Sequence, residues 1–296
     1  MKTIGMIGIG DMGSGIAQNL LNAGFNVRGF DLSPDRMAAF AQMGGTSCGS
    51  AAEVGDGADL VFLMVMNGDQ ARAATLGENG LSQTLASGAI LVLTATINPR
   101  EARDLDEDWE HTGWRLIASP VSGGRPGAEG GTRTLMAATT DDTFDDAGPA
   151  LQAIAGNIHR VGADFGDGQT VKACLQSLIG SIFTGAFEAT ALAAKAGVPG
   201  QVLYDVFSTS AAGCGITKAA IGTVIDRTFE GTGSHINTMH KDLTIALDLA
   251  QELGVPLFTA GTAMQLFQAG RTRYPDGDNQ SVARISEEII GTGLHR

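Results

Sequence analysis

Two polar side chains, Lys172 and Gln176, stand four residues apart within a largely apolar stretch of the chain. Residues four apart share one face of a helix, and Gly180 continues the same line, so this face presents an amine, an amide and then open space. Such a face suits a ligand with which the amine exchanges a proton. The alternative is a lysine whose stem lies along the protein while its ammonium reaches solvent, and the spacing alone leaves both readings open.

The element that must position these side chains is a helix predicted over residues 167–198. Apolar residues recur there with the i, i+3, i+4 spacing of a helix, and they cover more than one side. We therefore expect a buried helix, about 42 Å long at 1.5 Å per residue, which would run through a whole domain. Asp167 is the expected N-cap, and Gly197 with the following Val-Pro is the expected end.

Length and charge bound the kind of protein. The 296 residues are enough for two domains with substantial cores. With 19 basic and 32 acidic residues the net charge is -13, which argues against nucleic acid or an anionic membrane surface as a partner. The three cysteines are far apart and form no Cys-x-x-Cys pair, so neither a zinc site nor a disulfide framework is indicated.

A cytoplasmic location is the expectation that follows. A reduced compartment fits the three scattered cysteines, and the first apolar run, which stops before Asp11, is too short for a signal peptide. The long helix carries Gln176, Ser177 and Glu188, which favours a buried helix of a soluble protein over a membrane span.

A glycine-rich motif begins eight residues into the chain. The run Gly8-Ile9-Gly10-Asp11-Met12-Gly13 lies between a predicted strand at 3–8 and a predicted helix at 16–23, and a second predicted strand, 26–30, ends at Asp31. This context is that of a dinucleotide-binding fingerprint: the glycines allow a tight turn, close approach of a diphosphate and close packing of the helix. The alternative is a glycine-rich turn that binds nothing.

Asp31 predicts NAD rather than NADP as the cofactor. Its carboxylate would accept hydrogen bonds from the adenosine ribose and would repel the additional phosphate of NADP. The next residues, Leu32 and Ser33, offer no cation to that phosphate, and Arg36 lies one helical turn further on.

The first half of the chain alternates between strands and helices, which predicts a doubly wound α/β (Rossmann) domain with a parallel sheet covered on both faces. Further strands are predicted at 133–140 and 157–161, with a helix through 141–155 between them. After residue 162 the strand signals stop, so we expect an NAD-binding domain at 1–162 and an all-α domain at 163–296. The alternating strands are predicted at 59–65, 88–93 and 114–118, and the helices at 50–57, 68–75 and 99–111.

Ligands of such folds bind at the carboxyl ends of the strands. The first two of these ends carry Val65 and Met66, and Thr94-Ala95-Thr96, and are expected to border the cofactor. The third, 119–124, is a predicted glycine-rich loop whose amides suit a carboxylate.

Taken together, these motifs resemble the β-hydroxyacid dehydrogenase family, which includes 3-hydroxyisobutyrate dehydrogenases, tartronate semialdehyde reductases and L-threonate dehydrogenases. The resemblance spans essentially the whole chain, with several motifs in the family's order. The matching segments are 8–13, Thr96-Ile97-Asn98-Pro99, Pro120-Val121-Ser122-Gly123-Gly124, Gly166-Asp-Gly-Gln-Thr-Val-Lys172, Lys241-Asp242-Leu243 and Gly254-Val255-Pro256.

The resemblance implies a role for each predicted site residue. Lys172 would be the catalytic acid and base, Thr96 and Lys241 would lie beside the nicotinamide, and Gln176 would bind substrate or orient Lys172. A lysine near a helix N-terminus and a cationic nicotinamide should lose its proton readily, which agrees with that role. The residues expected to hold the substrate carboxylate are Ser122, Gly123 and Gly124; those expected at the cofactor are Gly8, Ile9, Gly10, Asp11, Met12, Gly13, Asp31, Leu32, Val65, Met66, Thr96 and Lys241; no metal is expected.

Three departures from the family pattern leave the substrate open. Ala118-Ser119 precedes Pro120 where many members have an aspartate. Leu175 and Gln176 stand where many members have two asparagines, and Gln176 resembles the branch that acts on four-carbon sugar acids such as threonate. Asn279 stands where an aspartate is common.

Two alternatives to a hydroxy-acid dehydrogenase remain. Imine reductases share the glycine loop and the long helix but usually lack the lysine, so Lys172 counts against them. A non-catalytic NAD-binding scaffold would not need the set Ser122, Lys172 and Gln176. In this family the long helix is usually covered partly by a second subunit, so the resemblance also implies a homodimer or homotetramer. It likewise implies that the 163–296 domain serves substrate binding and dimerisation.

Overall fold

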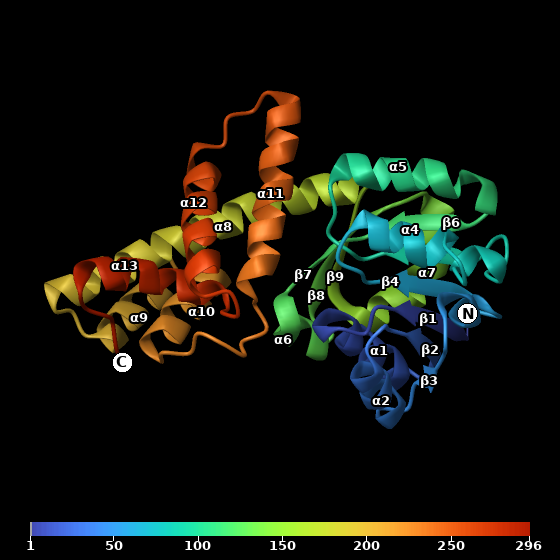
Figure 1. The fold of residues 1–296 in the computed structure, drawn as a ribbon, viewed down its shortest axis with the longest axis horizontal. Helices are drawn as coiled ribbons and strands as arrows, with labels where there is room; N and C mark the ends of the chain where they lie inside the picture. The colour runs from blue at the N-terminus through green and yellow to red at the C-terminus, as the bar shows by residue number, and fades with distance from the viewer. Residues whose placement is uncertain (1) are drawn as a thin grey trace. The chain divides into compact units, whose positions relative to one another are not determined.

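The computed structural model describes residues 2–296, which form two compact units, one ending at Lys172 and one running from Ala173 to Arg296 (Figure 1). The boundary falls inside a single long helix, α8 (Asp167–Ala196).

A nine-stranded sheet forms the first unit, in the order β3-β2-β1-β4-β5-β6-β8-β7, with β9 also paired to β8. The first six strands in this order are parallel, as predicted for a Rossmann domain. The strands are β1 (Thr3–Ile7), β2 (Asn26–Phe30), β3 (Thr46–Ser47), β4 (Leu60–Leu63), β5 (Ile90–Leu93), β6 (Arg115–Ala118), β7 (Val121–Ser122), β8 (Arg133–Ala138) and β9 (Ala155–Gly162).

One edge of this sheet adds antiparallel pairs to the predicted parallel arrangement. Strand β8 runs antiparallel to both β6 and β7, and Ser122 pairs with Thr134. The predicted loop at 119–124 therefore contains a strand, and helix α6 (Gly124–Glu129) begins at its last residue. The connection from β7 through α6 to β8 is short, and short connections join antiparallel strands, whereas parallel strands need a longer crossover.

Helices cover both faces of the sheet because its central strands alternate in the direction of their side chains. In β4, Leu60 and Phe62 belong to the buried cluster that contains residues of α1 (Asp11–Asn22) and α2 (Pro34–Gln42). Val61 and Leu63 belong to the cluster on the other face, which contains residues of α3 (Ala51–Gly55) and α5 (Pro99–Trp109). Helix α2 and strand β3 were not predicted; α2 buries only Phe40, so its apolar pattern is weak. The helices are α1 (Asp11–Asn22), α2 (Pro34–Gln42), α3 (Ala51–Gly55), α4 (Gly68–Leu76), α5 (Pro99–Trp109), α6 and α7 (Asp141–Ile154).

Helix α8 begins at Asp167 and ends at Ala196, before Gly197 with a φ of +74°, as the Gly-Val-Pro signal predicted. A buried helix was expected, and α8 is buried only in part within this chain, because Leu178 is 59% and Leu192 73% exposed. By length and composition α8 could cross a membrane, a property shared by core helices of soluble proteins. Because its aromatic side chains lie in the core of the second unit, we interpret it as a core helix.

The second unit is helical, as predicted. Within the described residues its only β-pairing is an isolated bridge between His235 and Asp278. Phe183 and Phe187 of α8 stack at 5.7 Å between centroids, and Phe267 meets Phe183 edge-on. The remaining helices are α9 (Gly200–Thr209), α10 (Gly215–Ile225), α11 (Ile236–Leu253), α12 (Phe258–Arg273) and α13 (Ala283–Ile290).

Candidate active site

The glycine motif forms the turn between β1 and α1, and close contacts require glycine at its first and last positions, Gly8 and Gly13. Gly8 has a φ of +85°, and a Cβ there would lie 2.1 Å from the Met64 carbonyl oxygen. A Cβ at Gly13 would lie 1.9 Å from the Gly8 carbonyl oxygen. No side chain of the described residues caps α1 at Gly10, so the first N–H groups of this helix are available to a phosphate. The turn therefore fits the diphosphate of a dinucleotide.

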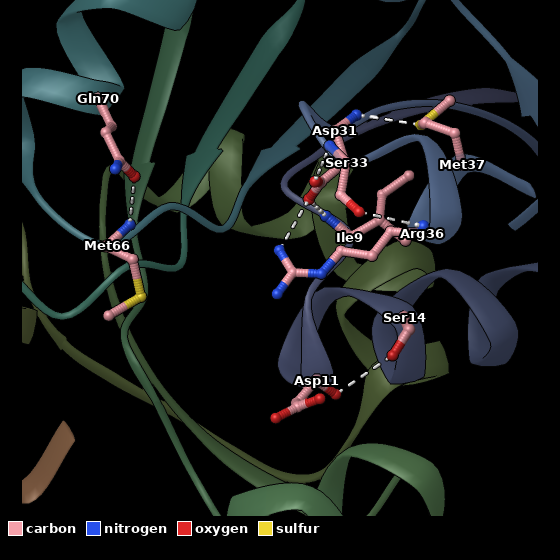
Figure 2. Close-up of polar contacts among 9 residues, drawn as sticks. All are labelled: Ile9, Asp11, Ser14, Asp31, Ser33, Arg36, Met37, Met66 and Gln70. Atoms are coloured by element: carbon pink, nitrogen blue, oxygen red, sulfur yellow. Dashed lines mark hydrogen bonds and ion pairs between the residues drawn. The ribbon is translucent and has the colours of Figure 1, made fainter. Parts of the chain in front are cut away.

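Asp31 lies at the end of β2, directly beside this turn (Figure 2). Its carboxylate accepts hydrogen bonds from the backbone N–H of Ile9 at 2.7 Å and of Ser33 at 2.9 Å. Arg36 reaches back from α2 and pairs with Asp31 at 3.6 Å. The sequence placed Arg36 only one turn further along; the structure brings its guanidinium to the glycine turn, 3.7 Å from where a Cβ of Gly10 would lie.

The predicted residues after β4 lie at the same carboxyl edge of the sheet as Asp31, on the other side of β1 (Figure 2). Met66 is 55% exposed and its N–H donates to Gln70 Oε1 at 3.0 Å; Val65 is half-buried. Leu32, after β2, is 88% exposed. Apolar side chains left exposed at strand ends suit the flat faces of a nucleotide.

Gln169, which the sequence analysis missed, fastens the loop after β5 to α8. Its side chain is fully buried; Oε1 accepts from the N–H of Ile97 at 3.1 Å and Nε2 donates to the carbonyl of Ala95 at 2.8 Å. These bonds fix the peptides on both sides of Thr96, and Lys172 follows three residues after Gln169 on the same helix. Gln169 lies inside the same sequence motif as Lys172, residues 166–172, and this position could have identified it as a site residue.

Lys172 is only 6% exposed, which excludes the alternative of a lysine reaching bulk solvent. The first turn of α8 packs closely on the sheet, since a Cβ at Gly168 would lie 2.5 Å from the Met136 carbonyl oxygen and 2.9 Å from that of Ala118. Both carbonyls belong to strands next to the Ser122 turn. The fold thus gathers Lys172, Thr96 and the Ser122 turn in one unit.

The Ser122 turn has a backbone that only glycine adopts readily. Gly123 has a φ of +130° and Gly124 a φ of +58°. Ser122 is half-buried, and α6 starts two residues later, at Gly124. Exposed amides before a short helix are consistent with the predicted carboxylate site.

Gln176 and Lys241 belong to the second unit, where Asp242 joins them. The amide Nε2 of Gln176 donates to Asp242 Oδ2, and Lys241 Nζ lies 3.0 Å from Asp242 Oδ1. Asp242 is 3% and Gln176 7% exposed, so this carboxylate is buried, accepts a hydrogen bond from Gln176 and forms an ion pair with Lys241. Asp242 was quoted within a sequence motif, but nothing in the sequence showed its contact with Gln176.

The turn, the acidic residue after β2 and the buried lysine define a nicotinamide-dependent oxidoreductase. Similarity to known protein families defines the class of oxidoreductase more narrowly. Residues 3–162 match the NAD-binding domain of 6-phosphogluconate dehydrogenase, and residues 166–286 match the family described as NAD-binding of NADP-dependent 3-hydroxyisobutyrate dehydrogenase.

Individual relatives agree over the full length. The L-threonate dehydrogenase of Cupriavidus necator is 35% identical, covering 95% of this chain and 94% of its own. The structure of a 3-hydroxyisobutyrate dehydrogenase from Salmonella typhimurium is similar with a TM-score of 0.89 and 30% identity, over 96% of this chain and 100% of that one. An imine reductase from Streptomyces aurantiacus, at 19% identity and a TM-score of 0.67 over 96% of this chain and 99% of its own, shares only the fold.

The chain belongs to the β-hydroxyacid dehydrogenase family. It is an NAD(P)-dependent oxidoreductase that acts on the CH–OH group of a small hydroxy acid, and the imine reductase and scaffold alternatives are not supported.

Proposed function

We propose that the protein interconverts a small, further hydroxylated β-hydroxy acid of the threonate type and its oxo acid, with NAD as the cofactor. The observation that carries the proposal is Lys172: a buried amine in the first turns of α8, on a segment that Gln169 fastens to the Thr96 loop. Thr96 and Lys241 are proposed to lie beside the nicotinamide. Gly8 to Gly13, Leu32, Val65 and Met66 are proposed to hold the rest of the cofactor.

Lys172 is proposed to move the proton of the reaction. In oxidation its neutral amine takes the hydroxyl proton while the C–O bond becomes a carbonyl, and in reduction its ammonium protonates the forming alkoxide. A bound NAD would supply the acceptor for the hydride that leaves the same carbon, which balances the two electrons. The amides of Ser122, Gly123 and Gly124 hold the carboxylate, so that the carbinol carbon stays oriented.

The orientation of the Gln176 amide supports a hydroxylated substrate. A carboxylate only accepts hydrogen bonds, so Asp242 requires the NH₂ group of Gln176 to face it. The Gln176 carbonyl oxygen then points to the other side as an acceptor. A hydroxyl of a sugar acid can donate to this oxygen, whereas the methyl group of 3-hydroxyisobutyrate cannot.

The choice of NAD over NADP is supported by the carboxylate of Asp31, which two backbone amides hold beside the glycine turn. Arg36 is already paired with that carboxylate. We expect a higher kcat/KM with NAD than with NADP. A higher value with NADP would instead mean that Arg36 leaves Asp31 for the additional phosphate.

The direct test follows the absorbance of reduced nicotinamide at mildly alkaline pH, with NAD or NADP and a panel of hydroxy acids. The panel contains threonate, erythronate, glycerate, 3-hydroxyisobutyrate, 3-hydroxypropionate and serine. We expect the highest kcat/KM with NAD and a four-carbon sugar acid. Turnover of 3-hydroxyisobutyrate at a higher kcat/KM than either sugar acid would contradict the proposed substrate class.

Replacing Gln176 by leucine should lower kcat/KM for the preferred sugar acid by about 10- to 100-fold, because a hydrogen bond to a buried substrate hydroxyl is lost. The value for 3-hydroxyisobutyrate should fall much less, so the ratio of the two is the decisive measurement. Gln251→Leu, on the exposed side of α11, is the matched control and should leave the ratio unchanged. An equal loss for both acids would mean that Gln176 does not select the substrate.

We also propose a homodimer or homotetramer. Large apolar side chains of the second unit remain exposed, including Leu178, Leu192 and Phe258, the last at 84%. A second subunit covering them should appear in sedimentation at micromolar concentration, where a monomer would refute the proposal.

A cytoplasmic location is proposed because the three cysteines, among them the exposed Cys174 and Cys214, are free thiols.

A further inference from the structure

A buried arginine that the proposed mechanism does not use lies beneath the glycine turn. Arg133, the first residue of β8, is 1% exposed. Its Nη2 donates to the carbonyl oxygen of Met12 at 3.0 Å and lies 3.4 Å from the Met12 sulfur. Among residues 2–296, no hydrogen-bond partner exists for its Nε or Nη1.

No carboxylate of the described chain lies within ion-pair distance of this guanidinium, in contrast to the arginines at the surface such as Arg115 and Arg160. Burial lowers the pKa of Arg133 to about 10, so the group remains charged at neutral pH. Burying a charge without a partner is costly. A protein is strongly destabilised when one member of a buried ion pair is removed, because the remaining charge is then buried without a partner. A retained, unpaired cation therefore points to an anion that binds nearby.

The surroundings of Arg133 show where that anion belongs. Met12 lies in the first turn of α1, whose positive dipole end already favours negative charge. The Met12 carbonyl shares its peptide unit with the N–H of Gly13, so a donor on the carbonyl strengthens that N–H as a donor toward a phosphate. The stem of Arg133 also passes the Ser122 turn, since its Cγ lies 3.5 Å from where a Cβ of Gly123 would be.

We propose that Arg133 is a positioning residue for the cofactor: a buried countercharge, acting through the Met12–Gly13 peptide, for the diphosphate bound at the start of α1. The inference rests on the proposed placement of the dinucleotide on the glycine turn. The substrate carboxylate at the Ser122 turn is the competing anion. The guanidinium contacts Met12 of the glycine turn, whereas only the stem passes Gly123, and this favours the diphosphate.

The test is equilibrium binding to the Arg133→Met variant, which keeps an unbranched side chain of similar length but removes the charge. The dissociation constants of NADH, ADP-ribose and adenosine are measured by calorimetry or fluorescence. NADH and ADP-ribose should bind at least about tenfold more weakly, and adenosine, which has no phosphate, within about twofold of wild type. Arg160→Met on the neighbouring strand β9 is the matched control and should change none of the three.

The midpoint temperature of thermal unfolding is a second readout. Replacing an arginine with a purely structural role would lower this temperature, whereas the proposal predicts no decrease. Without ligand, Arg133→Met should unfold at a temperature equal to or above that of wild type, because an unpaired buried charge is removed. The rise in midpoint caused by saturating NADH should shrink in the variant. If Arg133→Met does not accumulate as folded protein, Arg133→Lys is used instead. Lysine keeps the positive charge, so NADH should bind to this variant with a smaller loss of affinity than the roughly tenfold loss predicted for Arg133→Met.

Several outcomes would overturn the inference. These are unchanged NADH and ADP-ribose affinities in Arg133→Met, a lower unfolding temperature with unchanged affinity, or an effect confined to binding of the hydroxy acid. The last would assign the charge to the substrate carboxylate. If wild-type protein itself binds no NADH, the proposed function fails, and that result is distinct from each of these.

Discussion

Alanine in place of Lys172 is expected to lower kcat by about 100- to 10,000-fold, the usual contribution of a positioned acid or base. NADH should bind with the wild-type dissociation constant, because the amine acts on the substrate hydroxyl. Steady-state turnover with the best acid of the panel and NADH fluorescence titration measure the two quantities separately. The large effect follows from the burial of Lys172, since bulk water has little access to a buried position and cannot easily replace the amine.

The control for this variant lies on the same helix. Lys195 is in the last turn of α8, is exposed, and donates to the Ile290 carbonyl at 3.0 Å, so Lys195→Ala should keep wild-type kcat. Turnover of Lys172→Ala close to that of wild type would remove Lys172 from the mechanism. A parallel loss of NADH affinity would instead indicate that Lys172 supports the cofactor site.

Gly13→Ala is expected to weaken NADH binding by about 10- to 100-fold. The added Cβ would lie 1.9 Å from the Gly8 carbonyl oxygen, so the start of α1 must move away from the end of β1. Overpacking of this kind typically costs about 1–3 kcal/mol, and here the displaced backbone is the proposed diphosphate site. The NADH dissociation constant and the unfolding temperature should be measured together.

Gly148→Ala is the matched control, because a Cβ at Gly148 in α7 meets no atom within 4 Å. This change should leave NADH affinity unaltered and stabilise the protein slightly, since alanine favours a helix over glycine by about 1 kcal/mol. If Gly13→Ala bound NADH as tightly as wild type, the glycine turn would not be the cofactor site.

The sequence by itself determined the Rossmann order, the dinucleotide turn and the length of α8. These features have local signals: alternating apolar strands, glycines at fixed spacing, and a Gly-Val-Pro stop. The candidate catalytic residue was accessible for the same reason, because Lys172 lies in a short motif on one element. Strand β7 and helix α2 escaped prediction because two paired residues and a helix that buries only Phe40 leave almost no pattern.

Only the tertiary structure decided which polar side chains meet. Three hydrogen-bonded pairs join distant parts of the chain: Gln169 with the Ala95 carbonyl across 74 residues, Gln176 with Asp242 across 66, and Arg133 with the Met12 carbonyl across 121. No periodicity in the sequence predicts such pairs. Arg133 shows this most clearly: an arginine in a strand suggests a surface position, yet β8 lies inside the sheet and is covered by α6. The charge of a side chain is a property of the sequence, whereas the cost of its burial, and hence the anion it calls for, depends on what packs around it.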